Sequence, residues 1–104
     1  MKQYNEKHIN KFSKQELEKL GAQGQLIDVR TEEEYELAHI KGATLHPVDK
    51  IESFNKDKNK TYYIHCKSGT RSTKASEYLA EQGYDIVNLD GGYKAYEAKN
   101  EDNN

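Results

Sequence analysis

The sequence predicts an α/β fold in which helices cover both faces of a small, mostly parallel sheet. Short apolar runs alternate with helical patterns along the chain, and this alternation is typical of βα units. Glycines, a proline and helix-capping residues separate the runs. The chain has 104 residues, so we expect residues 1–104 to form one domain with a single core and a frayed polar tail at 99–104.

The first predicted helix begins at a capping box. Residues 13–16 place Ser and Glu three apart, the spacing at which each side chain accepts a hydrogen bond from the other residue's backbone. Leu17 and Leu20 then share one face of the helix, and Gly21 is expected to end it.

The next segment predicts a strand and a second capped helix. A buried strand is expected at 26–29, and residues 31–34 form another capping box. This box opens a short helix through about Ala38, with acidic residues at the positive end of the helix dipole. A brief strand at 44–45 is then ended by Pro47.

The second half of the chain continues the alternation. A short helix is expected over 49–54, with Ile51 and Phe54 facing inward, and a charged loop follows it. The remaining predicted elements are a strand at 61–65, a helix at 72–82 that stops at Gly83, a strand at 85–89 and a short helix at 93–98.

The composition limits the classes of function. The net charge is −2, so nothing favours attraction to nucleic acid or to a membrane surface. No apolar stretch could span a bilayer, residues 1–7 carry no apolar signal region, and one cysteine cannot form an internal disulfide, so we expect a cytoplasmic protein. The four histidines are dispersed and show no metal-ligand spacing with Cys66, so we assign no metal and no other cofactor.

The only cysteine, Cys66, directly follows the predicted strand at 61–65 and precedes the predicted helix. A turn of this kind aims successive backbone N–H groups at one point, and the helix N-terminus adds partial positive charge there. Both effects favour thiolate over thiol, so we expect a Cys66 pKa below that of a free thiol and a nucleophilic role. Ser72 is expected to cap the helix that starts here.

The composition of the turn suits an anion-binding loop. Gly69 permits positive φ and a close approach of backbone to ligand, while Ser68 and Thr70 carry small hydroxyl groups that can donate to an anion. Arg71 adds a cation that cannot be deprotonated, and Lys67 raises the local positive potential. A buried structural cysteine would explain Cys66 alone, but not this group of neighbours.

Three segments are expected to meet at one edge of the sheet. In open α/β sheets, ligands bind beyond the carboxyl ends of the strands. Residues 28–30, Cys66 and residues 90–92 all lie at such ends. The sequence therefore predicts a shallow cleft rimmed by these segments.

Four blocks of the chain resemble the rhodanese-like sulfurtransferases in their single-domain form. The blocks are residues 26–31 with 34–35, 39–43, 63–72 and 89–93, in the family's order and spacing. The resemblance implies a rhodanese-like fold with about five strands. Two departures are visible, because Ala38 stands where the family usually has glycine and Tyr96 stands where it often has tryptophan.

The resemblance also implies a reaction. Cys66 would take the outer sulfur of a donor such as thiosulfate or a low-molecular-weight persulfide and pass it to a thiophilic acceptor such as cyanide or a thiol. Arg71 would brace the loop, and Asp28 and Arg30 would support it from the neighbouring strand. A structural pairing of Asp28 and Arg30 with the turn at Glu34 stays open as the alternative, and His39 and His65 are expected to be scaffold.

Other functions stay open at this point. A cysteine phosphatase or arsenate reductase also surrounds an anion with a cysteine and an arginine, but the loop of the related phosphatases is one residue longer. Here Cys66 through Arg71 is six residues, which favours sulfur transfer. A non-catalytic module is disfavoured because the cysteine is present. A persulfide carrier that serves a sulfur-relay partner protein remains an alternative to small-molecule transfer.

Overall fold

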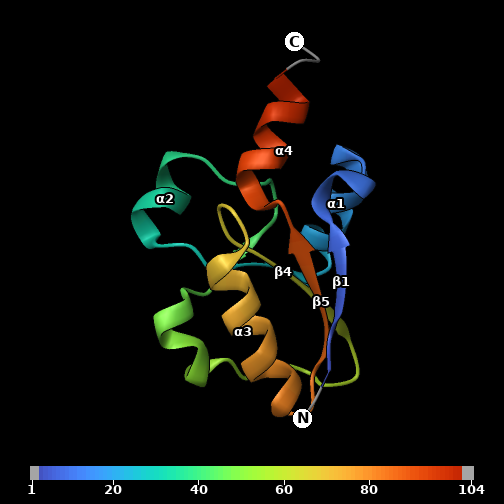
Figure 1. Ribbon diagram of the computed structural model, residues 1–104, viewed down its shortest axis with the longest axis vertical. Coiled ribbons are helices and arrows are strands. Elements are labelled where there is room, and N and C mark those ends of the chain that lie inside the picture. The colour runs from blue at the N-terminus through green and yellow to red at the C-terminus, as the bar shows by residue number, and fades with distance from the viewer. Residues whose placement is uncertain (1–2, 102–104) are drawn as a thin grey trace.

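Five strands form one sheet in the computed structural model, which describes residues 3–101 (Figure 1). The strands are β1 (Asn5–His8), β2 (Leu26–Asp28), β3 (Thr44–Leu45), β4 (Thr61–His65) and β5 (Asp85–Asp90), in the order β1-β5-β4-β2-β3. All four pairings are parallel, so the carboxyl ends of the strands meet at one edge of the sheet.

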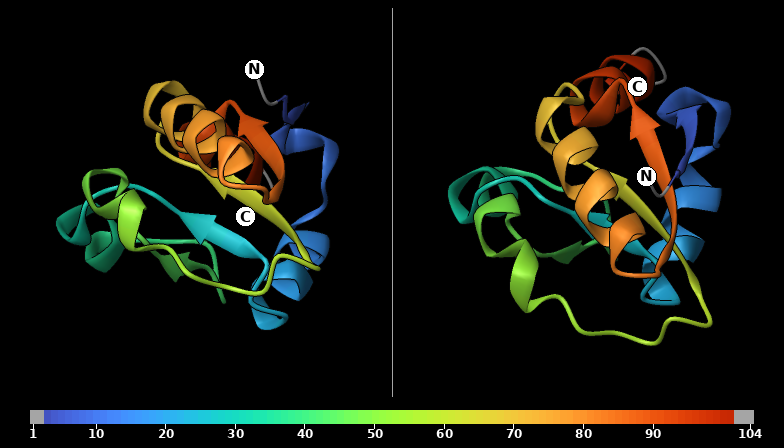
Figure 2. Two further views of the ribbon diagram at one scale, coloured as in Figure 1. Left: turned by 90° about the horizontal axis from the view of Figure 1, so that it is seen from below. Right: turned by 60° about the horizontal axis from the view of Figure 1, so that its bottom comes forward.

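Helices cover both faces of the sheet, as the sequence predicts (Figure 2). They are α1 (Lys14–Ala22), α2 (Glu32–Leu37), α3 (Thr70–Glu81) and α4 (Gly92–Glu101), with the 3-10 helices η1 (Ile9–Lys11) and η2 (Val48–Ser53). The core accordingly has two parts. On one face α3 and η2 bury Ala75, Leu79 and Ile51 against the sheet. On the other face α1 and α4 contribute Leu17 and Tyr96.

Both capping boxes are confirmed, but one helix end is wrong. The Glu16 N–H donates to Ser13 Oγ at 3.0 Å, and the Ser13 N–H donates to Glu16 Oε1 at 2.7 Å. Gly21 does not end α1, since it lies inside the helix where a Cβ would stand 2.7 Å from the Gly42 carbonyl carbon. The glycine therefore serves close packing, and Gly24, with a φ of 74°, takes the left-handed position after the helix.

Strand β1 has no counterpart in the sequence prediction. Its four residues, Asn5–His8, are all exposed, and they pair in parallel with β5 from Val87 to Asp90. An exposed edge strand needs no apolar face, so it leaves no alternating pattern in the sequence.

The last helix is longer than predicted. Helix α4 begins at Gly92 and continues through Glu101, so residues 99–101 of the expected frayed tail are helical. Residues 102–104 lie outside the described part of the chain. Within residues 3–101, no helix is long and apolar enough to cross a membrane.

Candidate active site at Cys66

The Cys66 turn joins the carboxyl end of β4 to the start of α3. Cys66 is only 1% exposed, and the helix begins at Thr70, two residues before the predicted start. Gly69 is its N-cap residue, with a φ of 122°, a value that L side chains rarely adopt. A Cβ on Gly69 would stand 3.4 Å from Asp90 Oδ1, so the end of β5 does border this turn, as the predicted cleft requires.

Two groups contact the sulfur atom. The Gly69 N–H donates to Cys66 Sγ at 3.0 Å, and the thiol lies 3.5 Å from Ser72 Oγ, to which it can donate. Ser72 is therefore not the helix cap, and its buried hydroxyl instead donates to the Gly69 carbonyl at 3.1 Å. Sequence reasoning missed this contact because the motif places Ser72 beyond the turn, whereas the earlier helix start turns it back toward the sulfur.

The environment lowers the pKa of the Cys66 thiol overall. Burial raises this pKa, but hydrogen bonds from the Ser72 side chain and backbone and from the Gly69 and Ser68 backbones outweigh it. The direction agrees with the sequence expectation. Backbone donors of the turn stabilise the anion as expected, and the Ser72 side chain adds a contribution that the sequence did not predict.

The start of α4 holds the carbonyl groups of the turn. The Tyr93 N–H donates to the Cys66 carbonyl at 2.8 Å, and the Lys94 N–H donates to the Lys67 carbonyl at 3.0 Å. Since a peptide N–H points opposite to its C=O, these bonds turn the next two amides of the loop away from α4. Gly92, with a φ of 59°, permits the contact because a Cβ there would stand 2.5 Å from the Cys66 oxygen.

Asp28 and Arg30 form a buried pair beside the turn. The Asp28 carboxylate is 0% exposed and accepts from Arg30 Nη2 at 2.7 Å and from the Arg30 backbone N–H at 3.0 Å. Arg30 also donates to the Ala38 carbonyl at 2.8 Å and stacks over the Tyr93 ring at 4.4 Å. The pair thus connects the end of β2 with the end of α2 and with α4.

His65 lies between the Asp28–Arg30 pair and the backbone of Cys66. Its Nδ1 lies 3.1 Å from the Cys66 carbonyl, and because that oxygen only accepts, Nδ1 carries the proton. Its Nε2 lies 3.8 Å from Asp28 Oδ2 and has no hydrogen-bond partner among the described residues. Burial lowers the pKa of His65 more than Asp28 raises it, so the ring is neutral at pH 7.

Arg71 pairs with Glu34 and not with the buried carboxylate of Asp28. Its Nη1 and Nη2 donate to Glu34 Oε1 and Oε2 at 2.6 and 3.0 Å, which joins the first turn of α3 to α2. The Arg71 hydrogen bonds are the largest cause of a Glu34 pKa of about 2, although burial opposes them. The sequence predicted that Glu34 caps its helix and left open a pairing of its turn with Asp28 and Arg30, but it did not predict the pair with Arg71, which lies 37 positions away.

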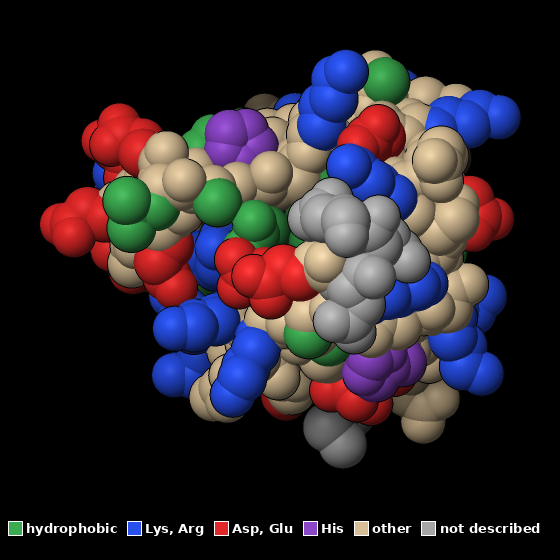
Figure 3. All heavy atoms as spheres, turned by 90° about the horizontal axis from the view of Figure 1, so that it is seen from above, with side chains coloured by type: hydrophobic (Ala, Val, Ile, Leu, Met, Phe, Trp, Pro, Cys, Tyr) green, Lys and Arg blue, Asp and Glu red, His purple; other side chains and the backbone are tan. Residues whose placement is uncertain are grey.

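The remaining predicted loop residues, Lys67, Ser68 and Thr70, are exposed. Their contacts with an anion stay a prediction. Seen toward the carboxyl edge of the sheet, side chains of both charges lie interspersed over the visible surface (Figure 3).

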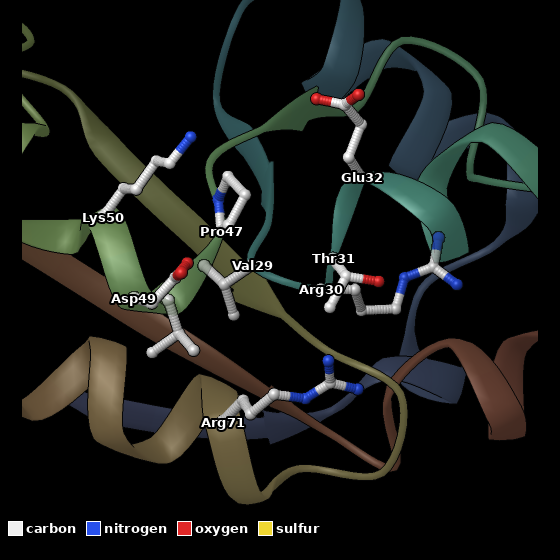
Figure 4. A pocket seen from close by; sticks show the side chains of 9 residues that line it. Val29, Arg30, Thr31, Glu32, Pro47, Asp49, Lys50 and Arg71 are labelled. Atoms are coloured by element: carbon white, nitrogen blue, oxygen red, sulfur yellow. The ribbon is translucent and has the colours of Figure 1, made fainter.

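Two cavities flank this region. One of about 380 Å³ lies between the end of β2, η2 and α3, and its lining includes Arg30, Thr31, Asp49, Lys50 and Arg71 (Figure 4). The other, of about 210 Å³, is lined by Arg30, Glu34, Leu37, Lys67, Tyr93 and Lys94 among others. The arrangement can therefore admit a small charged molecule on either side of the Arg71–Glu34 pair.

The two departures from the family pattern leave the site intact. Ala38 has a φ of −170° and a ψ of 143°, which is extended backbone that any residue adopts. Tyr96 is 8% exposed and its ring lies 5.6 Å from that of Tyr93. Among the described residues, no group of three or more His, Cys, Asp or Glu side chains is arranged to hold a metal ion.

Several known proteins are similar to this chain in sequence or in fold. PspE of Escherichia coli, named a thiosulfate sulfurtransferase, is 39% identical over 72 residues, which cover 65% of this chain and 69% of PspE. YtwF of Bacillus subtilis is 38% identical over 85 residues, 76% of this chain and 79% of YtwF. The crystal structure of a rhodanese-like domain protein from Staphylococcus aureus is 42% identical, with a TM-score of 0.66 over 80% of this chain and 86% of that one.

A family model described as the rhodanese-like domain matches residues 13–99. This match confirms the resemblance stated from the four sequence blocks, and the structural similarity confirms the predicted fold. The chain belongs to the rhodanese-like domain family.

Proposed function

We propose that this protein is a sulfurtransferase in which Cys66 carries the transferred sulfur as a persulfide. The observation that carries the proposal is the Gly69 N–H, which donates to Cys66 Sγ at 3.0 Å inside a six-residue turn. The chain's family and its similarity to PspE, a protein named a thiosulfate sulfurtransferase, support the same reaction class. The donors proposed are thiosulfate and low-molecular-weight persulfides.

The reaction proceeds in two halves. The Cys66 thiolate attacks the outer sulfur of thiosulfate, the bond between the two donor sulfurs breaks, and its electron pair leaves with sulfite. The acceptor, cyanide or a thiolate, then attacks the terminal sulfur of the Cys66 persulfide and releases the Cys66 thiolate. This covalent scheme divides one transfer into two displacements and needs no oxidant or reductant beyond donor and acceptor.

Backbone donors of the turn would stabilise the charges that develop. The Gly69 N–H donates to the sulfur of Cys66, and the loop amides that the start of α4 orients would meet the terminal sulfur of the persulfide. Asp28, Arg30 and His65 act through the loop backbone as positioning residues. Lys67 contributes positive charge for an anionic donor, and Arg71 braces the loop through its ion pair with Glu34.

The size of the turn disfavours the phosphatase and arsenate reductase alternatives. Six residues from Cys66 to Arg71 enclose a ring of amides with one donor fewer than the phosphatase loop. Because Gly69 directs its N–H at the sulfur itself, this ring suits one added sulfur atom better than a tetrahedral oxyanion.

Intact-mass measurement tests the proposal. Incubation with thiosulfate, or with glutathione persulfide, should raise the mass of the protein by one sulfur atom, and cyanide should then restore the original mass. Cys66→Ser is the matched control and should gain nothing from either donor. A wild-type protein that gains no sulfur from either donor would refute the proposal.

The same experiment separates catalysis from sulfur carriage. A catalyst returns to the unmodified mass within seconds to minutes of adding cyanide or a small thiol. A persulfide carrier for a relay partner would lose its added sulfur to these acceptors no faster than a free persulfide does. Loss of sulfur at only that rate would therefore replace the enzyme proposal with the carrier alternative.

A further inference from the structure

The guanidinium group expected to attract an anionic donor is already neutralised. Arg71 donates two hydrogen bonds to Glu34, at 2.6 and 3.0 Å, and the two side chains are 32% and 27% exposed. Paired in this way, a guanidinium offers an incoming anion little net charge. The arginine that the sequence motif identifies as a binding cation is therefore occupied by a carboxylate of the same chain.

The ion pair lies between the two cavities beside the turn. Arg71 lines the cavity of about 380 Å³, and Glu34 lines that of about 210 Å³. In Figure 4 the Arg71 side chain extends from α3 toward Thr31, along the wall of the larger cavity. Arg30 lines both cavities, but it is committed to Asp28 and the Ala38 carbonyl. Arg71 is consequently the guanidinium whose partner a ligand can replace.

Contacts with Thr31 hold the Glu34 carboxylate in place beside Arg71. Its Oε1 accepts from the Thr31 backbone N–H at 3.0 Å and from the Thr31 hydroxyl at 3.1 Å, which fixes the carboxylate at the start of α2. Its Oε2 contacts Arg71 alone among the side-chain partners in the described part of the chain. An anion can therefore take the place of Glu34 at Arg71 while the helix cap stays intact.

We propose that Glu34 is a specificity-determining residue, an internal carboxylate that competes with anionic donors for Arg71 and so limits their access to Cys66. The inference that Glu34 limits the access of sulfur donors rests on the proposed function. The competition for Arg71 does not, because Arg71 interacts electrostatically with Cys66, so its pairing with Glu34 changes the potential that any anionic reagent meets at this thiol. Removing the Glu34 charge should favour anionic over neutral reagents.

Cys66 alkylation by iodoacetate and by iodoacetamide tests this without sulfur transfer. The two reagents differ in charge, so the ratio of their rates reports the positive potential at the sulfur. In Glu34→Gln the ratio should rise about fivefold at low salt, the upper range for a partly exposed ion pair. Gln keeps the acceptor that caps α2, so the helix is preserved. The rise should shrink at high salt.

Glu33→Gln is the matched control. It removes one negative charge from the neighbouring, exposed residue of the same helix turn, and its ratio should stay near that of the wild type. Glu34→Asp keeps the net charge but shortens the reach by one methylene, so it should raise the ratio in the same direction by less. This variant keeps the test valid if Glu34→Gln is too unstable to measure.

Three results would overturn the proposal. The first is an unchanged ratio of the two alkylation rates in both Glu34 variants, and the second is an equal rise of this ratio in Glu33→Gln. The third is a loss of alkylation by both reagents alike, which would show that the Arg71–Glu34 pair is only a structural brace. With thiosulfate as substrate, KM should fall about fivefold in Glu34→Gln with little change in kcat. A raised alkylation ratio without any sulfur transfer would refute the proposed function and leave the competition standing.

Discussion

At the sulfur atom of Cys66, the hydrogen-bond donors come from both sides of the helix start. The Gly69 N–H lies 3.0 Å away, and the Ser72 hydroxyl lies 3.5 Å away, where it can either donate to the Gly69 carbonyl or turn toward a thiolate. Because the sulfur is buried, any donor that is lost leaves the anion without replacement by water. The pKa of the Cys66 thiol therefore depends on each of these individual hydrogen bonds.

Replacing Ser72 should make the thiol harder to ionise. In Ser72→Ala the burial that raises the pKa of Cys66 persists while the largest opposing hydrogen bond is gone, so the pKa should rise. The rate of alkylation by iodoacetamide, measured against pH, gives the inflection. Ser76→Ala is the control, since it deletes a buried hydroxyl of α3 that has no hydrogen-bond partner among the described residues. An unchanged inflection in Ser72→Ala would contradict this account.

At the scale of elements, α4 and α2 position the turn from opposite sides. The first amides of α4 hold the Cys66 and Lys67 carbonyls, and the ion pair from Glu34 to Arg71 joins α2 to the first turn of α3. Each contact lies at the start of a helix, where backbone donors or a capping residue are available. The loop is thus held by elements that do not themselves touch the sulfur.

Gly92→Ala should disrupt the contact between α4 and the turn. Both Gly92 and Gly24 have positive φ, so alanine at either position costs about 1–2 kcal/mol of backbone strain. Only at Gly92 does a Cβ also meet backbone, 2.5 Å from the Cys66 oxygen, whereas nothing lies within 4 Å at Gly24. Urea unfolding should show Gly92→Ala to be less stable than Gly24→Ala by about 1–3 kcal/mol. Equal losses, or undiminished Cys66 reactivity in Gly92→Ala, would contradict the proposed contact.

The pairing between α2 and α3 should make stability depend on pH in acid. The folded-state pKa of Glu34, about 2, is depressed from 4.5, so its contribution is fully present above about pH 4.5 and is lost as pH falls toward about 2. Wild type should exceed Glu34→Gln in free energy of unfolding at pH 7, and the difference should narrow through this window. Glu33→Gln, measured by the same urea titrations, should show no such narrowing. A constant difference would indicate that the charge of Glu34 does not contribute.

For the whole molecule, the parallel sheet brings distant segments to one edge. The carboxyl ends of β2, β4 and β5 place Asp28, Cys66 and Asp90 together because all three strands run in the same direction. The two cavities lie beside this group, in a fold shared with the Staphylococcus aureus rhodanese-like protein. We propose that the size of the turn sets the chemistry of this site, since function depends on the site and not on the fold.

Lengthening the turn should sharply lower the rate of sulfur transfer. One glycine inserted after Gly69 would add a residue to the ring and move donors that must lie about 3 Å from the developing charge. The same insertion after Lys58, in the loop before β4, is the control, because that loop lies at the opposite end of the strand. Steady-state rates with thiosulfate should fall sharply only in the first variant. Undiminished transfer there, or strong aryl phosphatase activity in the wild type, would contradict the assignment of the reaction.

Local patterns in the sequence were sufficient to predict most of the helices and strands and to identify Cys66 as the catalytic candidate. Both capping boxes, the strand before Cys66 and the stop at Gly83 depend on residues that are close in sequence, so each can be predicted without the rest of the fold. The reactive turn is likewise one continuous segment. Strand β1 escaped prediction because an exposed edge strand carries no apolar pattern.

Contacts between distant residues were decided only by the tertiary structure. Glu34 looks like a helix cap in the sequence, and only folding shows that it also neutralises Arg71. Gly21 looks like a helix stop in the sequence, but the structure needs glycine there because the backbone of Gly42 leaves no room for a Cβ. Composition and spacing determine which residue can react, whereas the charge that a donor meets depends on which side chains the sheet brings together. A side chain's partner is a property of three-dimensional packing, and a local motif does not encode it.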